Sequence, residues 1–229
     1  MNQNVITMIL KNGTTTGIVQ SNLDEWIGVS YRIPRTKLKE AKELKGIDNT
    51  GVYILFGTDE DTGKNRAYIG EAEDIYKRLI QHNKSKEFWR ECTIFVSQDN
   101  SLNKAHIKFI ENELYLKANQ VGRYVIENDT KPTKTTLDGA DEIRAIKFYE
   151  KIKMLTSIYG YPIFDDIVSK EKIEEQKNIL YLTNNKITYA KGIMTDEGFV
   201  ILKGSKIKEG IEKGYILDEQ AECDMFSLS

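Results

Sequence analysis

Residues 51–70, GVYILFGTDEDTGKNRAYIG, decide the fold of this chain. The apolar run from Val52 to Phe56 and the run from Arg66 to Gly70 each have the length of a β-strand. The acidic, glycine-containing segment from Thr58 to Gly63 lies between them and is typical of a hairpin connection. The stretch therefore predicts two antiparallel strands joined by a short loop, and each strand carries one tyrosine.

These two tyrosines, Tyr53 and Tyr68, are the first candidate functional residues. Opposite residues of an antiparallel pair point to the same face of the sheet. A register with Tyr53 opposite Tyr68 would place two phenol hydroxyls side by side. The plainer interpretation is that tyrosine is simply a common strand residue, so the pair needs support from other parts of the chain.

The composition indicates a soluble globular protein. The chain has 229 residues, of which 40% are hydrophobic and 30% are charged. Its apolar stretches are too short to span a bilayer, and the N-terminus has no secretory signal pattern. The only two cysteines, Cys92 and Cys223, lie far apart and indicate neither a disulfide framework nor a zinc site. We therefore expect a cytoplasmic protein without a membrane association.

The net charge of -2 matters for any nucleic-acid partner. Nucleic-acid binding depends largely on phosphate contacts from basic residues, so the positive surface of this chain must be local. Two basic runs are candidates, although such runs are more often solvated faces. They comprise Arg35, Lys37, Lys39, Lys42 and Lys45 in the first, and Lys203, Lys206 and Lys208 in the second.

The segments around the tyrosine strands predict a mixed α and β chain with three parts. We expect an N-terminal extension at 1–47, a central domain at 48–165 and a small β-rich C-terminal domain at 175–229. The extension would hold a β-hairpin at 4–20, with an Asn12-Gly13 turn and a second strand from Thr15 to Gln20, and then a helix from Pro34 to Leu44. Apolar periodicity in the central domain predicts helices at Ala72–Asn83, Asn103–Asn119 and Asp141–Tyr159, and a strand at Thr93–Val96.

The C-terminal part changes in composition after Pro162. The charged segment from Ser169 to Lys177 predicts a linker or an exposed helix. Beyond it, short apolar runs alternate with turn residues. These runs are Ile179–Leu182, Ile187–Ala190 and Phe199–Leu202.

The helix after the second tyrosine strand carries Arg78, which lies at the shoulder of its apolar stripe. An arginine in this position can reach over the adjoining sheet face, and its planar guanidinium matches phosphate oxygens. His82 follows one helical turn later. The alternative is a surface ion pair between Arg78 and Asp74, which lie at i and i+4 spacing.

Glu111 lies within the apolar arc of the next helix, among Ile107, Leu114 and Ala118. A carboxylate that faces a core is costly unless it binds a cation, a metal or a hydrogen-bond donor. A structural ion pair is one explanation. Together with two tyrosines and an arginine, however, Glu111 offers an oxygen ligand for a hard divalent ion. Metal-assisted phosphodiester hydrolysis is the reaction class that these groups fit.

In this order the motifs resemble those of the GIY-YIG nuclease superfamily. The resemblance covers roughly residues 48 to 130, and fourteen residues separate its two tyrosine motifs, a few more than is usual in the family. It is carried by Gly51-Val52-Tyr53, Ala67-Tyr68-Ile69-Gly70, Arg78, Lys108-Phe109-Ile110-Glu111 and Asn128. The family fold that it implies is α/β (α+β), a small antiparallel three-stranded sheet flanked by helices.

The resemblance also implies roles for the candidate residues. Tyr53 would be the general base or the group that positions a water, and Tyr68 would support it. Arg78 would stabilise the phosphate charge, and Glu111 would hold a single Mg²⁺ or Mn²⁺ ion. Two further candidates complete the catalytic set, Asn128 and, more weakly, His82.

The flanking segments resemble those of a bacterial subgroup of this superfamily. Tyr31–Leu38 is similar to its N-terminal extension, and Gly160–Phe164 is similar to the segment after its nuclease domain. The segment Ala190–Ser205 resembles a small domain of unknown role, through which a homodimer or a protein partner could form.

The primary hypothesis is a divalent-metal-dependent endonuclease that hydrolyses DNA phosphodiester bonds, in restriction, repair or phage defence. The acidic balance of the chain motivates an alternative, a non-catalytic module that binds nucleic acid or protein on a nuclease scaffold. A nuclease that stays silent until a partner activates it is a third. The sequence leaves open the substrate sequence, its strandedness and the choice between DNA and RNA.

Overall fold

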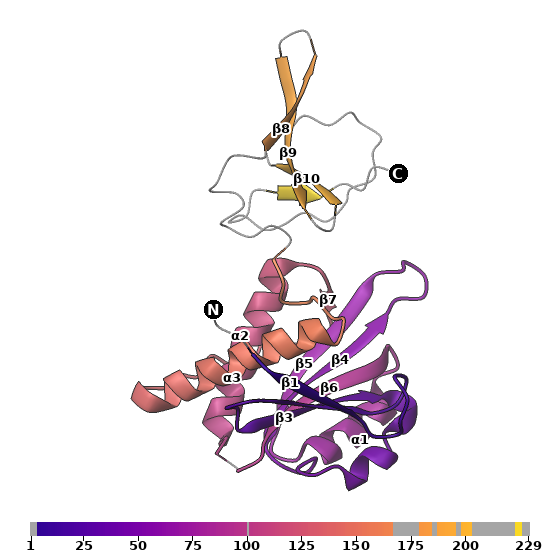
Figure 1. Cartoon of the computed structure of the whole chain (residues 1–229), viewed down its shortest axis with the longest axis vertical. Helices are drawn as coiled ribbons and strands as arrows, with labels where there is room; N and C mark the ends of the chain where they lie inside the picture. The colour runs from indigo at the N-terminus through magenta and orange to yellow at the C-terminus, as the bar shows by residue number, and fades with distance from the viewer. Residues whose placement is uncertain are drawn as a thin grey trace. The chain divides into compact units, whose positions relative to one another are not determined.

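The computed structural model describes residues 4–99, 101–166, 179–184, 187–195, 198–202 and 223–225. The chain divides into two compact units, both drawn in Figure 1. No helix in the described part of the chain has the length and apolar character of a membrane span. The first unit comprises Met1–Asn119 and Tyr124–Pro162, and the second comprises Gln120–Arg123 and Ile163–Ser229.

A seven-stranded sheet forms the centre of the first unit (Figure 1). Its strand order is β1-β2-β3-β6-β4-β5-β7, and all neighbours are antiparallel except β5 and β7. The two tyrosine strands are β4 and β5. The bounds are β1 (Ile6–Leu10), β2 (Val19–Leu23), β3 (Gly28–Pro34), β4 (Gly51–Thr58), β5 (Asn65–Ala72), β6 (Trp89–Ser97) and β7 (Val125–Ile126).

The prediction of mixed α and β structure is confirmed, whereas the prediction of a three-stranded sheet is wrong. The expected strands correspond to β6, β4 and β5, but β3 pairs with β6 along its whole length, from Gly28 opposite Ser97 to Pro34 opposite Glu91. Strands β2 and β1 follow it, so the N-terminal segment extends the same sheet. Nearly every residue of β3 is buried, so the strand lacks the alternation that marks a half-exposed one.

The N-terminal elements also differ from their predicted positions. The second strand of the hairpin begins at Val19 rather than Thr15, because the connection is longer than an Asn12-Gly13 turn. Within it, the Lys11 amide donates to the Ile18 carbonyl at 2.9 Å. The predicted helix from Pro34 is replaced by two 3₁₀ turns, η1 (Arg35–Lys37) and η2 (Glu40–Glu43), which bury Leu38 and Ala41 in the core.

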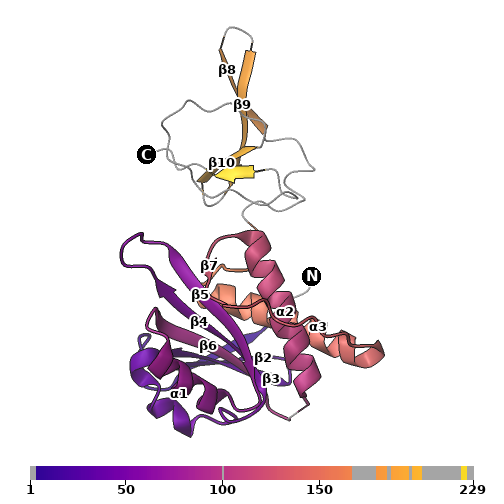
Figure 2. The same cartoon turned by 180° about the vertical axis from the view of Figure 1, so that it is seen from behind.

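Three helices pack around the sheet, close to their predicted positions: α1 (Ile75–Ser85), α2 (Lys104–Val121) and α3 (Gly139–Ile158). Figures 1 and 2 show α1 and α3 on opposite faces. Alternation along β4 directs Tyr53 and Leu55 to the face where Ile75 and Leu79 of α1 complete the core. Val52, Ile54 and Phe56, which are also buried, point to the other face. The candidate tyrosine therefore lies beneath α1.

The second unit contains a four-stranded antiparallel sheet in the order β11-β10-β9-β8. Strands β8, β9 and β10 correspond to the predicted apolar runs. The predicted linker at Ser169–Lys177 and the basic run at Lys203, Lys206 and Lys208 lie outside the described residues. The bounds are β8 (Ile179–Asn184), β9 (Ile187–Thr195), β10 (Gly198–Leu202) and β11 (Cys223–Met225).

Candidate functional site

Tyr53 occupies a closed position in the middle of the sheet. It is fully buried, and the residue opposite it on β5 is Gly70, not Tyr68 as the sequence suggested. A Cβ atom on Gly70 would lie 2.3 Å from the Tyr53 hydroxyl oxygen, so only glycine leaves room for the phenol. Tyr68 lies opposite Leu55, diagonal to Tyr53 on the same face. The two tyrosine rings still stack, with centroids 6.2 Å apart.

The Tyr53 hydroxyl is held by two side chains of α1. It lies 2.7 Å from His82 Nε2, and Arg78 Nε donates to it at 3.4 Å. Burial, and then the neighbouring Tyr68, raises the pKa of Tyr53 well above its usual value. Burial, with the positive charges of Arg78 and Lys86, lowers the pKa of His82 to about 4. At neutral pH the buried contact therefore joins a neutral phenol to a neutral imidazole.

Arg78 reaches the site in the way its position on the helix predicts. Its side chain is exposed, and Nη1 donates to Gln81 Oε1 at 3.2 Å. The hydrogen bond to Tyr53 raises the pKa of the guanidinium further. The alternative ion pair with Asp74 does not form, because Asp74 caps α1 and accepts from the Lys77 amide at 2.8 Å. The planar cation therefore stays available at the surface above Tyr53.

Glu111 lies half-buried on α2, where the sequence predicted an inward-facing carboxylate. Burial, and then the nearby Glu71 carboxylate, raises its pKa to about 7. Three weaker influences act in the opposite direction: a hydrogen bond from the Glu71 backbone and the charges of Lys104 and Arg78. Glu111 is therefore a partly desolvated carboxylate beside a second one, which is an environment that favours an additional cation.

The donor set around Glu111 fits a hydrated hard cation. Mg²⁺ commonly keeps several waters and uses only one or two protein carboxylates. Glu111 can supply such an oxygen, and the repulsion from Glu71 would decrease when a cation binds. No group of three or more potential histidine, cysteine or carboxylate ligands occurs within the described part of the chain. A closed zinc centre of that kind is therefore absent from the described residues, and Glu111 is the residue that could hold a hydrated ion such as Mg²⁺.

Asn128 acts on the backbone of β5. Its Oδ1 accepts from the Ile69 amide at 3.0 Å, and its Nδ2 donates to the Ile69 carbonyl at 2.7 Å. Strand β7 pairs only with Arg66 and Ala67, so this amide takes the place of a neighbouring strand beyond that point. Asn128 therefore fixes the chain between Tyr68 and Gly70, and reaches the tyrosine site through that backbone.

Lys86 is a member of the site that sequence reasoning missed. Its Nζ lies 4.6 Å from the centre of the Tyr68 ring, and it also pairs with the Asp129 carboxylate at 3.6 Å. The Tyr68 ring in turn lies 5.0 Å from the His82 ring. A signal for Lys86 was present in its spacing, because it follows Arg78 by eight residues and His82 by four, which places it at the C-cap of α1 next to the turn that carries His82.

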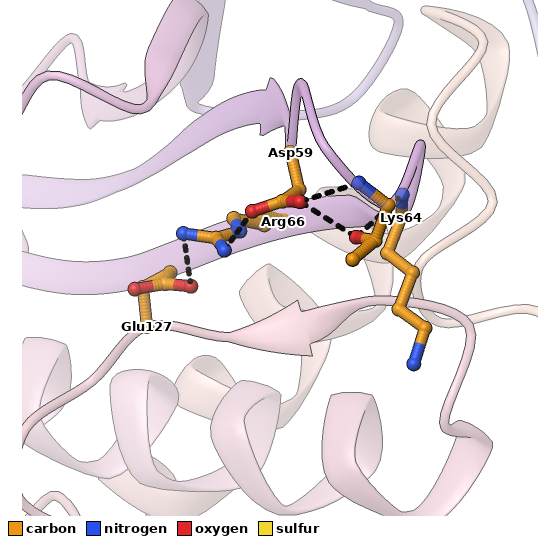
Figure 3. Close-up of polar contacts among 5 residues, drawn as sticks. Asp59, Lys64, Arg66 and Glu127 are labelled. Carbon is orange, nitrogen blue, oxygen red and sulfur yellow. Dashed lines mark hydrogen bonds and ion pairs between the residues drawn. The ribbon is translucent and has the colours of Figure 1, made fainter.

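A second polar cluster lies where β4 turns into β5, and comprises Asp59, Arg66 and Glu127 (Figure 3). The Arg66 guanidinium contacts the Asp59 carboxylate, and its Nη1 lies 3.4 Å from Glu127 Oε1. Asp59 also accepts from the amide and the hydroxyl of Thr62, at 2.8 and 2.7 Å. We call these three charged residues the hairpin-end cluster. It holds the acidic turn against the edge of the sheet.

Two cavities accompany these regions. One of about 720 Å³ lies beside the hairpin-end cluster, where Arg66 and Arg90 line it. Another of about 330 Å³ lies beside the candidate site, where Glu71, Arg78 and Lys104 line it. Arg78 lines the second cavity and also contacts the Tyr53 hydroxyl. The smaller cavity is therefore the one connected to the candidate site.

The structure thus brings together Tyr53, Tyr68, Arg78 and His82, which we call the tyrosine cluster. Glu111 is linked to this cluster electrostatically, because its charge acts on Tyr53 and it is itself affected by Arg78. Asn128 supports the cluster through β5. The arrangement could pass a proton between Tyr53 and His82, present the Arg78 guanidinium to an oxyanion and offer the Glu111 carboxylate to a cation.

The match to a family model covers the same elements. Residues 49–136 match the model described as the GIY-YIG catalytic domain. This range contains β4, β5, α1, β6, α2 and β7, and with them every residue of the cluster. Neither the curated proteins nor the solved structures yielded a match to the chain.

Proposed function

We propose that the chain is a divalent-metal-dependent endonuclease that hydrolyses DNA phosphodiester bonds, because residues 49–136 match the model of the GIY-YIG catalytic domain, which implies nuclease activity. The observation that carries this proposal is the hydroxyl of Tyr53, buried between His82 and Arg78. A neutral phenol and a neutral imidazole 2.7 Å apart form a path along which a proton can pass.

Arg78 is the residue that meets the substrate first in this proposal. Its side chain is exposed, so the guanidinium can turn from the Tyr53 oxygen to the non-bridging oxygens of a phosphate. That movement uncovers the Tyr53 hydroxyl for an attacking water. The positive charge then offsets the negative charge that develops on phosphorus during in-line attack.

Tyr53 and His82 handle the proton of the attacking water. The raised pKa of Tyr53 argues against a resting phenolate, so the phenol acts as a relay. Its oxygen takes a proton from the water while its own proton passes to His82 Nε2. Tyr68 packs against both rings and keeps this pair aligned. The departing oxygen leaves with the electron pair of the broken P–O bond.

Glu111 would hold the divalent ion, Mg²⁺ or Mn²⁺. When bound, such an ion supplies Lewis-acid stabilisation of the phosphate charge. The contribution of the protein is a carboxylate that is already partly desolvated and close to a second carboxylate. Without a cation, the desolvated Glu111 carboxylate lowers the stability of the folded chain. Binding of a cation would offset this unfavourable free energy.

Cleavage of supercoiled plasmid DNA in MgCl₂ or MnCl₂ tests the proposal. Tyr53→Phe and Glu111→Ala should each lower the rate by about 100-fold or more while circular dichroism stays unchanged. Tyr115→Phe and Glu113→Ala are matched controls, because they make the same two changes at positions of α2 outside the site. Wild-type rates in either site variant would contradict the assignment. Binding without cleavage by the wild type would favour a non-catalytic module.

A further inference from the structure

The cavity beside Arg78 contains a second cation whose role the proposed mechanism leaves open. Lys104, the first residue of α2, lines this cavity of about 330 Å³ together with Arg78 and Glu71. The three side chains come from three elements, α2, α1 and β5. They line one cavity at the end of β5, so a phosphate group held by Arg78 there lies near Lys104.

Lys104 is held in place by acidic neighbours and still faces the cavity. Its Nζ donates to Glu71 Oε2 at 2.8 Å and lies 3.7 Å from Glu73 Oε2. The Lys104 side chain is 42% exposed, whereas that of Glu71 is only 14% exposed. An ammonium group has three donors, and one hydrogen bond to Glu71 leaves the others for a ligand in the cavity.

Lys77 also lines this cavity with an ammonium group, whereas Asp74, Arg78 and Gln81 have contacts of their own. Asp74 caps α1 through the Lys77 amide, and Arg78 contacts Tyr53 and Gln81. Lysine differs from arginine in carrying a compact charge on a flexible stem, so Lys104 can change partners without a change in the backbone. Its present partner, Glu71, is an oxyanion, and a phosphate oxygen has the same hydrogen-bonding requirements.

We propose that Lys104 is a second substrate-binding cation of this site, which contacts a backbone phosphate of the nucleic-acid strand that Arg78 holds. In the free protein the Lys104 ammonium donates a hydrogen bond to the Glu71 carboxylate. On binding, a phosphate oxygen replaces the Glu71 carboxylate or joins it. The role rests on the proposed function, because it requires a nucleic-acid strand at Arg78.

Binding in the presence of a chelator tests Lys104 separately from cleavage. The probe is a short fluorescein-labelled DNA duplex, whose anisotropy is followed in EDTA at a series of salt concentrations. Lys104→Gln should weaken binding about tenfold and reduce the slope of log K against log salt by about 0.9, the value for one phosphate contact. Lys104→Arg should retain both values. Lys153→Gln is the matched control, because Lys153 pairs with Glu150 on α3.

Substitutions at Glu71 test whether Lys104 binds the substrate or only neutralises the charge of the Glu71 carboxylate. Glu71→Gln releases Lys104 and should tighten binding. The double variant Glu71→Gln/Lys104→Gln should bind as weakly as Lys104→Gln, and it keeps the test valid if the single variant is unstable. Wild-type affinity in Lys104→Gln or in the double variant would overturn the role, since Lys104 would then only neutralise Glu71. A wild-type protein that binds no duplex would overturn the proposed function as well.

Discussion

The tyrosine cluster and the hairpin-end cluster both place an arginine against oxygen acceptors on the β4–β5 half of the sheet, yet they have opposite physical characters. In the tyrosine cluster, the contact between Tyr53 and His82 is buried and joins two neutral groups. In the hairpin-end cluster, Arg66 meets two carboxylates, and its side chain is 34% exposed. The first region joins neutral groups whose pKa values are shifted mainly by burial, and the second joins partly exposed charged groups, where hydrogen bonds from Thr62 lower the pKa of Asp59.

The difference shows which of the two regions depends on exact side-chain positions. Exposed ion pairs contribute little to stability because water already solvates both charges. The hairpin-end cluster is partly exposed, since its side chains keep between 13% and 34% of their surface accessible, and it holds the turn through ion pairs. The buried phenol and imidazole lack water, so small changes in position or charge change their protonation. Substitutions in the two regions should therefore differ widely in effect.

Alanine substitutions at two glycines, Gly70 and Gly63, should give the largest difference in stability and in cleavage. Gly70→Ala places a Cβ atom 2.3 Å from the Tyr53 hydroxyl oxygen, so it should destabilise the fold by about 1–3 kcal/mol or more and abolish cleavage. At the turn, Gly63→Ala meets no atom within 4 Å and suffers only from the positive φ of 67°. It should cost about 1 kcal/mol and leave cleavage intact.

Urea unfolding and plasmid nicking measure both variants of this pair. The Gly63 variant serves as the control for a glycine-to-alanine change within the same hairpin. An active Gly70→Ala protein would show that the sheet can move away from Tyr53. The central strand would then be more adaptable than its eight paired positions with β5 indicate.

Glu111→Gln should give an intermediate effect with a characteristic pH dependence. The folded chain keeps the Glu111 proton up to about pH 7, whereas the unfolded chain loses it near the ordinary value of 4.5. The unfolding free energy of the wild type therefore falls as the pH rises from about 4.5 to 7. Glutamine removes this dependence, so the variant should be more stable by about 1–3 kcal/mol above pH 7 and inactive as a nuclease.

The measurement for Glu111 is urea unfolding in EDTA at pH 5 and pH 8, with Glu113→Gln as control on the same helix. The gain should be present at the higher pH and small at the lower one. Added MgCl₂ should stabilise the wild type more than the Glu111 variant. Equal stability of the two proteins at both pH values would show that Glu111 is ionised at little cost, and would weaken its assignment as a cation ligand.

Much of the fold around the site was predictable because the local signals agree with the tertiary structure. The three helices follow apolar periodicity, and the tyrosine strands follow apolar runs bounded by turn residues. The N-terminal strands were less accessible. In β2, the sequence Val-Gln-Ser-Asn-Leu places polar residues within a strand, and Ser21 is fully buried there. Only pairing with β1 and β3 makes this segment a strand.

The candidate site shows the same limit at the level of single residues. The positions of Arg78 and Glu111 were accessible because one helical wheel suffices to orient each of them. The register of the hairpin was not, since it depends on every pair from Gly51 opposite Ala72 to Thr58 opposite Asn65. The role of Asn128 was also hidden, because it depends on a strand edge that β7 leaves uncovered.

The smallest expected effect belongs to the exposed end of the hairpin. Arg90 pairs with Glu60 at 2.5 Å, but the two side chains are 70% and 82% exposed. Glu60→Gln should therefore leave the melting temperature and the cleavage rate at their wild-type values. Differential scanning fluorimetry and plasmid nicking provide the two measurements, and Gly70→Ala marks the opposite end of the scale. Tighter DNA binding by Glu60→Gln would instead mean that Glu60 competes with phosphate for Arg90. In that case the larger cavity beside the hairpin end would also receive the nucleic-acid strand, and the contrast between the two regions would apply to chemistry but not to binding.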